Sequence, residues 1–216
     1  MKGKLIIFEG INGSGKSFYV KQITDNYLPN TVYLKFPNRT TKTGKLINKF
    51  LKKEIEIPNK KIIQLFIDNI LENNQLIINK LYQGINVICD RYIISTLTYH
   101  YSNMIKECFK NDISNKDTIS ALLKLIQYKF LPKPDIVFLI NGNHFDKRNI
   151  NESDLQRYHK DELMNIIVFN NYITFLTLLN DNWEIIDNTN LNKTKENLDI
   201  IITKILLLKT NIIQYY

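Results

Sequence analysis

A strand, a glycine-rich loop and a helix follow one another near the start of this 216-residue chain, and this order constrains its fold more than any other feature. The apolar run Leu5-Ile-Ile-Phe8 is typical of a buried parallel strand. After the loop, Tyr19, Ile23 and Tyr27 lie at helical spacing until Pro29. The sequence therefore predicts a phosphate-binding α/β unit, with a chance match in a surface turn as the alternative.

The loop carries the Gly-x-x-x-x-Gly-Lys-Ser pattern of a P-loop. Glycine is needed because successive backbone N–H groups curl around phosphate oxygens, and side chains would block their approach. The positive end of the following helix dipole, the Lys16 ammonium and the Ser17 hydroxyl suit a nucleoside triphosphate with Mg²⁺. The expected nucleotide-binding residues are Gly10, Ile11, Asn12, Gly13, Ser14, Gly15, Lys16 and Ser17.

Length and composition indicate one domain over residues 1–216 in a reducing, cytoplasmic setting. The formal charge of +8 is spread along the sequence rather than gathered in a stripe, which disfavours nucleic-acid binding. Cys89 and Cys108 form neither a disulfide framework nor a metal motif. The apolar N-terminal run is too short for a signal peptide, and lysines interrupt residues 200–213, so we expect no membrane span.

Five short runs rich in β-branched and aromatic residues alternate with helical patterns, the clearest of which predicts a single helix over 60–82, ending before Gly84. This alternation predicts a parallel sheet with helices on both faces and ligands at the carboxyl ends of its strands. A polar insertion at 141–157 without apolar periodicity predicts a mobile lid. The predicted strands are residues 4–9, 31–36, 85–90, 135–140 and 183–187.

Of 29 basic residues only four are arginines, and all four lie after a predicted strand or in the expected lid. Arg39 follows the second strand, Arg91 follows the third, and Arg148 and Arg157 lie in the lid. Only arginine offers a planar fork for two phosphate oxygens, so these positions indicate anion binding. The alternative is that each arginine pairs with a surface carboxylate.

Three further polar residues are candidates for the same site. Asp90 ends a buried strand, where its carboxylate either caps the next turn or holds Mg²⁺ opposite Ser17. Glu9, just before the loop, could orient the loop or a substrate hydroxyl. Asn12 could bind a ribose hydroxyl or support its own turn.

With these residues assembled, the chain resembles the thymidylate kinases of the branch shared by eukaryotes and large DNA viruses, over about residues 4–187. The P-loop alone is common to a superfamily, whereas the other motifs at these spacings are specific. They are Phe36-Pro-Asn-Arg-Thr-Thr-Lys-Thr-Gly44, Asp90-Arg-Tyr-Ile-Ile-Ser95, Leu131-Pro-Lys-Pro-Asp135, Gln156-Arg-Tyr158 and Trp183-Glu-Ile-Ile-Asp187.

The resemblance implies a three-layer P-loop kinase fold with a five-stranded parallel sheet, Mg²⁺-dependent transfer of the ATP γ-phosphoryl group to dTMP, and a homodimer. It implies catalytic roles for Lys16, Arg91 and a lid arginine, Arg148 or Arg157, and a metal site at Ser17 and Asp90. The substrate residues it implies are Asn12 at the sugar hydroxyl, Arg39 and Arg91 on the phosphate, Phe66 and Ile70 at the base, and Tyr99 beside the deoxyribose. Phe36 is a further expected substrate-binding residue.

One departure bears on substrate choice: Ile70 stands where the family has an arginine that reads thymine O4. Asn73 and Asn74 lie one turn further along the same face of the predicted helix, so an asparagine amide could replace that guanidinium in part. Two alternatives to a dTMP kinase follow. One is a nucleoside monophosphate kinase with relaxed or shifted base specificity, and the other is a non-catalytic nucleotide-binding module.

Overall fold

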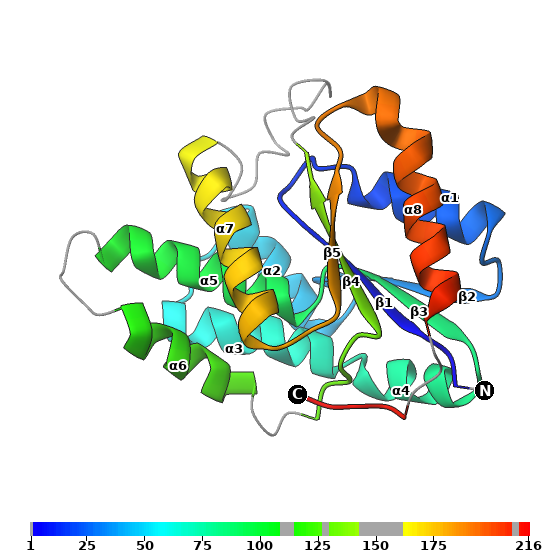
Figure 1. Cartoon of the computed structure of the whole chain (residues 1–216). Helices are drawn as coiled ribbons and strands as arrows, with labels where there is room; N and C mark the ends of the chain where they lie inside the picture. The colour runs from blue at the N-terminus through cyan, green and yellow to red at the C-terminus, as the bar shows by residue number, and fades with distance from the viewer. Residues whose placement is uncertain (1, 109–114, 127–129, 143–161, 209–211) are drawn as a thin grey trace.

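In a computed structural model, the chain folds around a five-stranded parallel sheet, and residues 2–108, 115–126, 130–142, 162–208 and 212–216 are described (Figure 1). The strand order is β2-β3-β1-β4-β5. All five predicted strands are confirmed, each within one residue at either end. They are β1 (Leu5–Glu9), β2 (Thr31–Lys35), β3 (Asn86–Asp90), β4 (Ile136–Asn141) and β5 (Trp183–Asp187).

Helices cover both faces of the sheet, as Figure 1 shows. The α-helices are α1 (Lys16–Asn26), α2 (Lys42–Leu51), α3 (Asn59–Leu71), α4 (Asn74–Tyr82), α5 (Ile93–Cys108), α6 (Asn115–Ile126), α7 (Glu162–Leu178) and α8 (Thr194–Leu207), and a 3₁₀ turn, η3, spans Leu191–Lys193. Among these, no helix combines the length and the apolarity needed to cross a membrane.

Successive side chains of β1 point to opposite faces of the sheet and enter two different hydrophobic cores, which explains why helices cover both faces. Leu5 and Ile7 pack with α3, α4, α5 and α7 on one face, while Ile6 and Phe8 pack with α1 and α8 on the other. All four side chains are buried, as expected for a central parallel strand. A third, smaller cluster joins α2 to α3 through residues such as Ile47 and Ile62.

The prediction of one helix over 60–82 is wrong, because the chain breaks between α3 and α4 at Glu72 and Asn73. The Asn73 side-chain Nδ2 donates to the Asn69 carbonyl at 2.9 Å, taking the acceptor that a continuing α-helix would offer to the Asn73 backbone N–H. That N–H bonds instead to the Ile70 carbonyl at 3.0 Å. The second segment ends as expected, with Gly84 at a φ of 78° two residues beyond Tyr82.

Because all strands run parallel, their carboxyl ends meet at one edge of the sheet. Glu9, Lys35 and Asp90 end three adjacent strands there, and the P-loop leaves β1 from the same edge. The expected lid at 141–157 continues from β4 at this edge, but beyond Gly142 it lies outside the described residues. Its catalytic candidates, Arg148 and Arg157, lie outside them as well.

Candidate active site

The P-loop backbone has the conformation for which glycine was expected to be needed. Gly10, Gly13 and Gly15 all have positive φ values, of 136°, 80° and 102°. A Cβ on Gly10 would lie 2.5 Å from the Ile140 carbonyl oxygen, so no larger residue fits there. Helix α1 begins at Lys16 directly after the loop, and its first N–H groups and positive dipole end therefore face the cavity.

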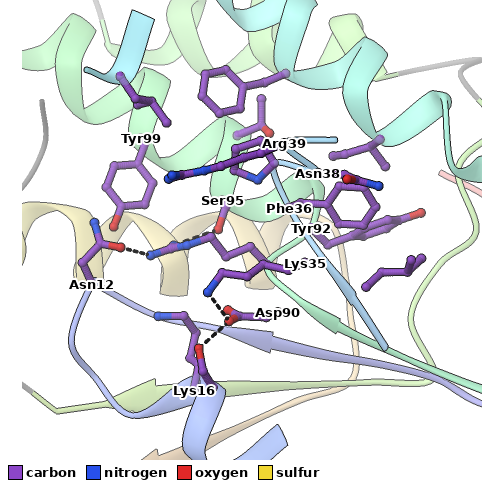
Figure 2. Close-up of a pocket in the computed structure, with 18 of the residues that line it drawn as sticks. Asn12, Lys16, Lys35, Phe36, Asn38, Arg39, Asp90, Tyr92, Ser95 and Tyr99 are labelled. Atoms are coloured by element: carbon purple, nitrogen blue, oxygen red, sulfur yellow. Dashed lines mark hydrogen bonds and ion pairs between the residues drawn. The ribbon is translucent and has the colours of Figure 1, made fainter. Parts of the chain in front are cut away.

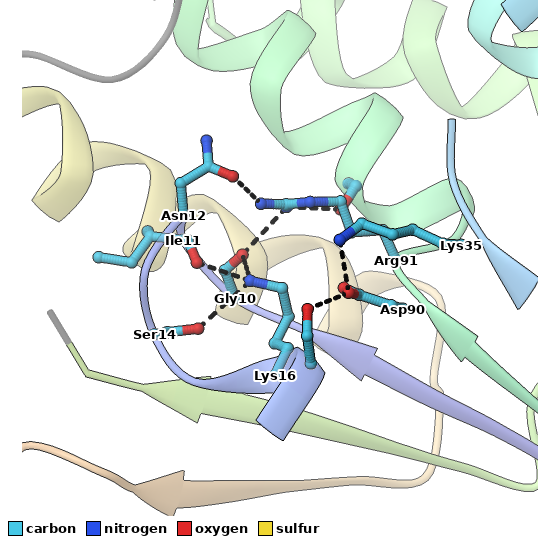
Figure 3. Close-up of polar contacts among 10 residues, drawn as sticks. Gly10, Ile11, Asn12, Ser14, Lys16, Lys35, Asp90 and Arg91 are labelled. Atoms are coloured by element: carbon cyan, nitrogen blue, oxygen red, sulfur yellow. Dashed lines mark hydrogen bonds and ion pairs between the residues drawn. The ribbon is translucent and has the colours of Figure 1, made fainter. Parts of the chain in front are cut away.

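The Lys16 side chain is buried and folds back over the loop (Figure 3). Its ammonium donates to the carbonyl oxygens of Gly10 and Ile11, at 3.0 and 2.6 Å, and to the Ser14 hydroxyl at 3.3 Å. Burial, together with the nearby Arg91 guanidinium, holds the pKa of Lys16 well below its ordinary value. The loop carbonyls bring only partial negative charge to this cation, so a polyphosphate would stabilise its charged form.

Asp90 and Ser17 face each other at the floor of the site. The Ser17 hydroxyl donates to Asp90 Oδ2 at 2.7 Å. Burial alone would raise the pKa of Asp90, but Lys16, Lys35 and Arg91 outweigh it and hold that pKa below its ordinary value. The carboxylate is therefore ionised at neutral pH.

The donor set at Asp90 fits Mg²⁺. Asp90 Oδ1 is buried and has no hydrogen-bond partner among the described residues, which leaves one carboxylate oxygen available to a ligand. No cluster of three or more His, Cys, Asp or Glu side chains suited to a metal lies in the described part of the chain. Mg²⁺ needs no such cluster, since it binds through one or two protein oxygens together with phosphates and water. Ser17 and Asp90 supply that pair.

A cavity of about 700 Å³ opens above these groups and contains most of the predicted site (Figure 2). It runs from the P-loop, past the ends of β2 and β3, to α3 and α5. Gly10, Ile11 and Ser14 lie behind the cavity wall as the partners of Lys16. The predicted residues that line the cavity are Asn12, Gly13, Gly15, Lys16, Ser17, Phe36, Arg39, Phe66, Ile70, Asp90, Arg91 and Tyr99.

Arg91 is held rigidly in the middle of the cavity. Its guanidinium donates to the Asn12 side-chain oxygen, to the Gly10 carbonyl at 3.0 Å and to the Tyr172 hydroxyl at 3.0 Å. It also lies 5.3 Å from the centre of the Tyr99 ring, within range of a cation–π contact. No carboxylate of the described residues lies within 4.0 Å, so the surface ion-pair alternative does not hold for this arginine.

Arg39 lines the same cavity as Arg91, and Figure 2 shows it among the lining side chains. Its side chain is exposed, and it has neither a hydrogen bond nor an ion pair to any other described residue. The ion-pair alternative therefore fails here too. Two guanidinium groups, one fixed and one free to adjust, face the same space, as a bound phosphate would require.

Glu9 does not face the cavity, although it could have been a substrate ligand. Its Oε1 accepts from the backbone N–H groups of Tyr92 and Ser95, at 2.9 and 3.1 Å, and its Oε2 accepts from the Ser95 hydroxyl. Burial raises the pKa of Glu9 to about 7, although Ser95 and Arg91 partly oppose this shift. Glu9 therefore orients the start of α5 rather than a substrate.

Part of the cavity wall is apolar. Phe66, half-buried on α3, and the buried Ile70 one turn later both line it. The expectation that Asn73 and Asn74 reach this region is wrong. The Asn73 oxygen accepts from Asn38 at 3.0 Å, Asn74 donates to the Phe130 carbonyl at 3.2 Å, and neither lines the cavity.

Sequence reasoning missed two residues of this site. Asn69, fully buried on α3, accepts from the Asn38 N–H at 2.7 Å and donates to the Asn38 carbonyl at 3.1 Å and to the Thr41 hydroxyl at 2.8 Å. Lys35, beside Asp90, also lines the cavity. One signal in the sequence could have indicated Asn69. It lies three residues after Phe66, which places both on one face of the helix.

Comparisons with known proteins agree with this geometry. A family model described as thymidylate kinase matches residues 8–199. The chain belongs to the thymidylate kinase family. Among curated members, a thymidylate kinase of Dictyostelium discoideum is 30% identical over 193 residues, covering 86% of this chain and 78% of that protein. One of Plasmodium falciparum is 38% identical over 143 residues, covering 65% of this chain and 62% of that protein.

Solved structures of family members extend over nearly the whole chain. The thymidylate kinase of Candida albicans, which is described as having broad substrate specificity, superposes with a TM-score of 0.78 at 27% identity. The match covers 99% of this chain and 98% of that one. The thymidylate kinase of Ehrlichia chaffeensis, with a TM-score of 0.64 at 21% identity, shares the fold and covers 96% of this chain and all of its own. The predicted P-loop kinase fold is thus confirmed.

Proposed function

We propose that this member of the thymidylate kinase family transfers the γ-phosphoryl group of ATP to dTMP, giving dTDP for dTTP synthesis. The observation that carries the proposal is that one cavity brings together three kinds of group. Lys16 and the P-loop, the guanidinium groups of Arg39 and Arg91, and the apolar side chains of Phe66 and Ile70 all line it. These groups suit a triphosphate, an acceptor phosphate and a base, respectively.

The chemistry requires no general base from the chain. The second pKa of a nucleotide phosphate is about 6, so the acceptor is mainly a dianion at neutral pH. Catalysis then depends on alignment and on neutralisation of charge. Lys16 would hold the transferred group, Arg39 and Arg91 would orient the acceptor, and a lid arginine, Arg148 or Arg157, would close over both.

Ser17 and Asp90 are the residues proposed to hold Mg²⁺, supported by the oxygen of Asp90 that has no partner among the described residues. The ion supplies charge neutralisation at the phosphates when it is bound. Asn12 is proposed to meet the sugar hydroxyl through its amide while its oxygen keeps the contact with Arg91. Tyr99, half-buried at the cavity wall, is proposed to disfavour a 2′-hydroxyl.

The test is Lys16→Ala in a coupled assay of ADP formation with ATP and dTMP. We expect kcat to fall by at least about 10³-fold with the circular dichroism spectrum retained, because the lost charge acts on the phosphates. Lys21→Ala, an exposed lysine of α1 that pairs with Asp25, is the matched control and should leave kcat unchanged. A folded Lys16→Ala enzyme with normal turnover would refute the assignment of the P-loop.

Ile70 supports a second candidate, a nucleoside monophosphate kinase with relaxed base specificity. Its apolar side chain lines the cavity where the resemblance implies an arginine at the base edge. A homodimer and a cytoplasmic location are also proposed, both resting on the family resemblance. Analytical ultracentrifugation of the full chain tests the first, since a purely monomeric protein at assay concentration would contradict it.

A further inference from the structure

Lys35 has no role in the function proposed above, although its ammonium lies within the site (Figure 3). It is the last residue of β2 and stands opposite Asp90 of β3 in the register of the sheet. Its Nζ lies 3.3 Å from Asp90 Oδ2. The same oxygen accepts the hydrogen bond from Ser17. One carboxylate oxygen therefore serves both the metal-site hydroxyl and this lysine.

The Lys35 end of this ion pair is accessible to solvent. The Lys35 side chain is 60% exposed, whereas that of Asp90 is 2% exposed. Asp90 has two further cations beside it, because Lys16 and Arg91 also hold its pKa down. An exposed, flexible side chain such as that of Lys35 can turn from Asp90 toward the cavity.

The position on Asp90 conflicts with a bound Mg²⁺. If Ser17 and Asp90 hold the ion, the Lys35 ammonium and a divalent cation lie at the two oxygens of one carboxylate, and the two positive charges repel each other at this short range. This repulsion favours movement of Lys35 away from Asp90. It lines the same cavity as Arg39 and Arg91, and only three residues separate it from Arg39 along the chain. A long stem and three rotatable donors suit a phosphate in that space.

We infer that Lys35 is a further catalytic residue: it rests on Asp90 in the metal-free site and moves to the acceptor phosphate when Mg²⁺ is bound. This inference rests on the proposed function. It makes the contribution of Lys35 to dTMP binding depend on Mg²⁺, since Lys35 reaches the acceptor phosphate only when the metal site is filled. The proposed function alone does not require this dependence. The binding of dTMP and of Mg²⁺ are then coupled through one side chain.

The test measures the dissociation constant of dTMP by isothermal titration calorimetry at saturating ADP, once with Mg²⁺ and once with EDTA. ADP is used so that no turnover occurs. Lys35→Met should weaken dTMP binding about tenfold with Mg²⁺, the loss expected for one charge-assisted contact, and should leave it unchanged in EDTA. Lys35→Arg, which keeps the charge, should retain most of the wild-type affinity with Mg²⁺.

Two controls keep the result interpretable. Lys204→Met removes another partly exposed lysine that has an ion pair, with Glu184 on β5, and should behave as the wild type under both conditions. Equal circular dichroism spectra and melting temperatures for Lys35→Met and the wild type exclude a loss of fold, and Lys35→Gln serves as a second neutral variant.

An equal loss of affinity with and without Mg²⁺, or no loss in either condition, would overturn the inference while leaving the proposed function intact. The first result would make Lys35 a fixed phosphate ligand, and the second would make it a surface charge. If the wild-type protein itself binds no dTMP under either condition, the proposed function fails and the inference falls with it.

Discussion

The side chain of Asn69 bonds to both backbone polar groups of Asn38, 31 residues earlier in the chain. Its oxygen accepts from the Asn38 N–H, and its amide donates to the Asn38 carbonyl, at 2.7 and 3.1 Å. This contact fixes the loop that follows β2 against helix α3. Arg39 is the next residue of that loop, so a buried amide on α3 determines where the proposed phosphate ligand begins.

Asn69→Ala should therefore impair both stability and substrate binding. Its loss leaves the Asn38 N–H without this partner, at a cost of about 1–3 kcal/mol in the free energy of unfolding. We also expect a rise in the KM for dTMP with little change in the KM for ATP, because Arg39 loses its support while the P-loop is untouched. Urea unfolding and steady-state kinetics measure the two effects. Equal changes in both KM values would contradict this positioning role.

Titration of Glu9 makes the stability of the protein depend on pH. Burial raises the pKa of Glu9 from its ordinary 4.5 to about 7, so folding favours the protonated acid. The resulting contribution to stability is complete below about pH 4.5 and is lost as the pH rises through about 7. Above that range the fold holds a buried carboxylate at a cost.

Glu9→Gln replaces that carboxylate with a neutral amide of the same shape. Relative to the wild type, the free energy of unfolding should gain about 2–3 kcal/mol more at pH 8 than at pH 5. Urea unfolding at the two pH values measures the difference. Glu184→Gln, a partly exposed carboxylate of β5 paired with Lys204, is the control. A Glu9→Gln effect of equal size at both pH values would mean that Glu9 does not titrate in this range.

Local patterns were sufficient for the sheet and the P-loop but not for contacts between distant segments. Each strand is a short apolar run, and the loop glycines are set by backbone geometry, so both could be read from neighbouring residues. At the break, the Asn73 side chain bonds to the Asn69 carbonyl and also accepts a hydrogen bond from Asn38, and no local window of the sequence contains the second contact. The apolar residues keep their helical spacing through residue 73, but helix α3 ends at Leu71.

The same limit explains the site residues that were missed. Arginine was informative because it is rare in this chain, whereas Lys35 is one of many lysines and is distinguished only by its register with Asp90. Glu9 was recognised as a site-edge residue, but whether it faced a substrate depended on the Ser95 and Tyr92 groups that α5 brings to it. Tertiary placement rather than residue type decided both cases.

The catalytic lid arginine is tested by Arg148→Lys and Arg157→Lys. If one of them stabilises the transferring phosphoryl group, its substitution should lower kcat at least about tenfold, since lysine lacks the planar fork. The KM for dTMP should change little, because the contact forms mainly in the transition state. Steady-state kinetics of the two variants, with Lys147→Arg as a control in the same segment, separate the candidates. An unchanged kcat in both would place the catalytic cation elsewhere.

Ile70 is expected to weaken base discrimination, since it presents an apolar side chain to the cavity where the family resemblance implies a guanidinium that reads thymine O4. The Asn73 amide, which could have compensated, is bound to Asn38 and Asn69 instead. A charged hydrogen bond of this kind is worth about 1.5–3 kcal/mol. We therefore expect the wild type to accept dCMP, which carries an amino group at that position, more readily than a chain with arginine there would.

Ile70→Arg should raise the ratio of kcat/KM for dTMP over dCMP by about tenfold or more. The new side chain can extend into the cavity because Ile70 already lines it. The ratio of dTMP to dUMP is the internal control and should stay constant, because both bases carry O4 and differ only at the C5 methyl group. Ile70→Leu, which keeps the apolar wall, should resemble the wild type. Strict rejection of dCMP by the wild type, unaltered in Ile70→Arg, would mean that other residues read the base.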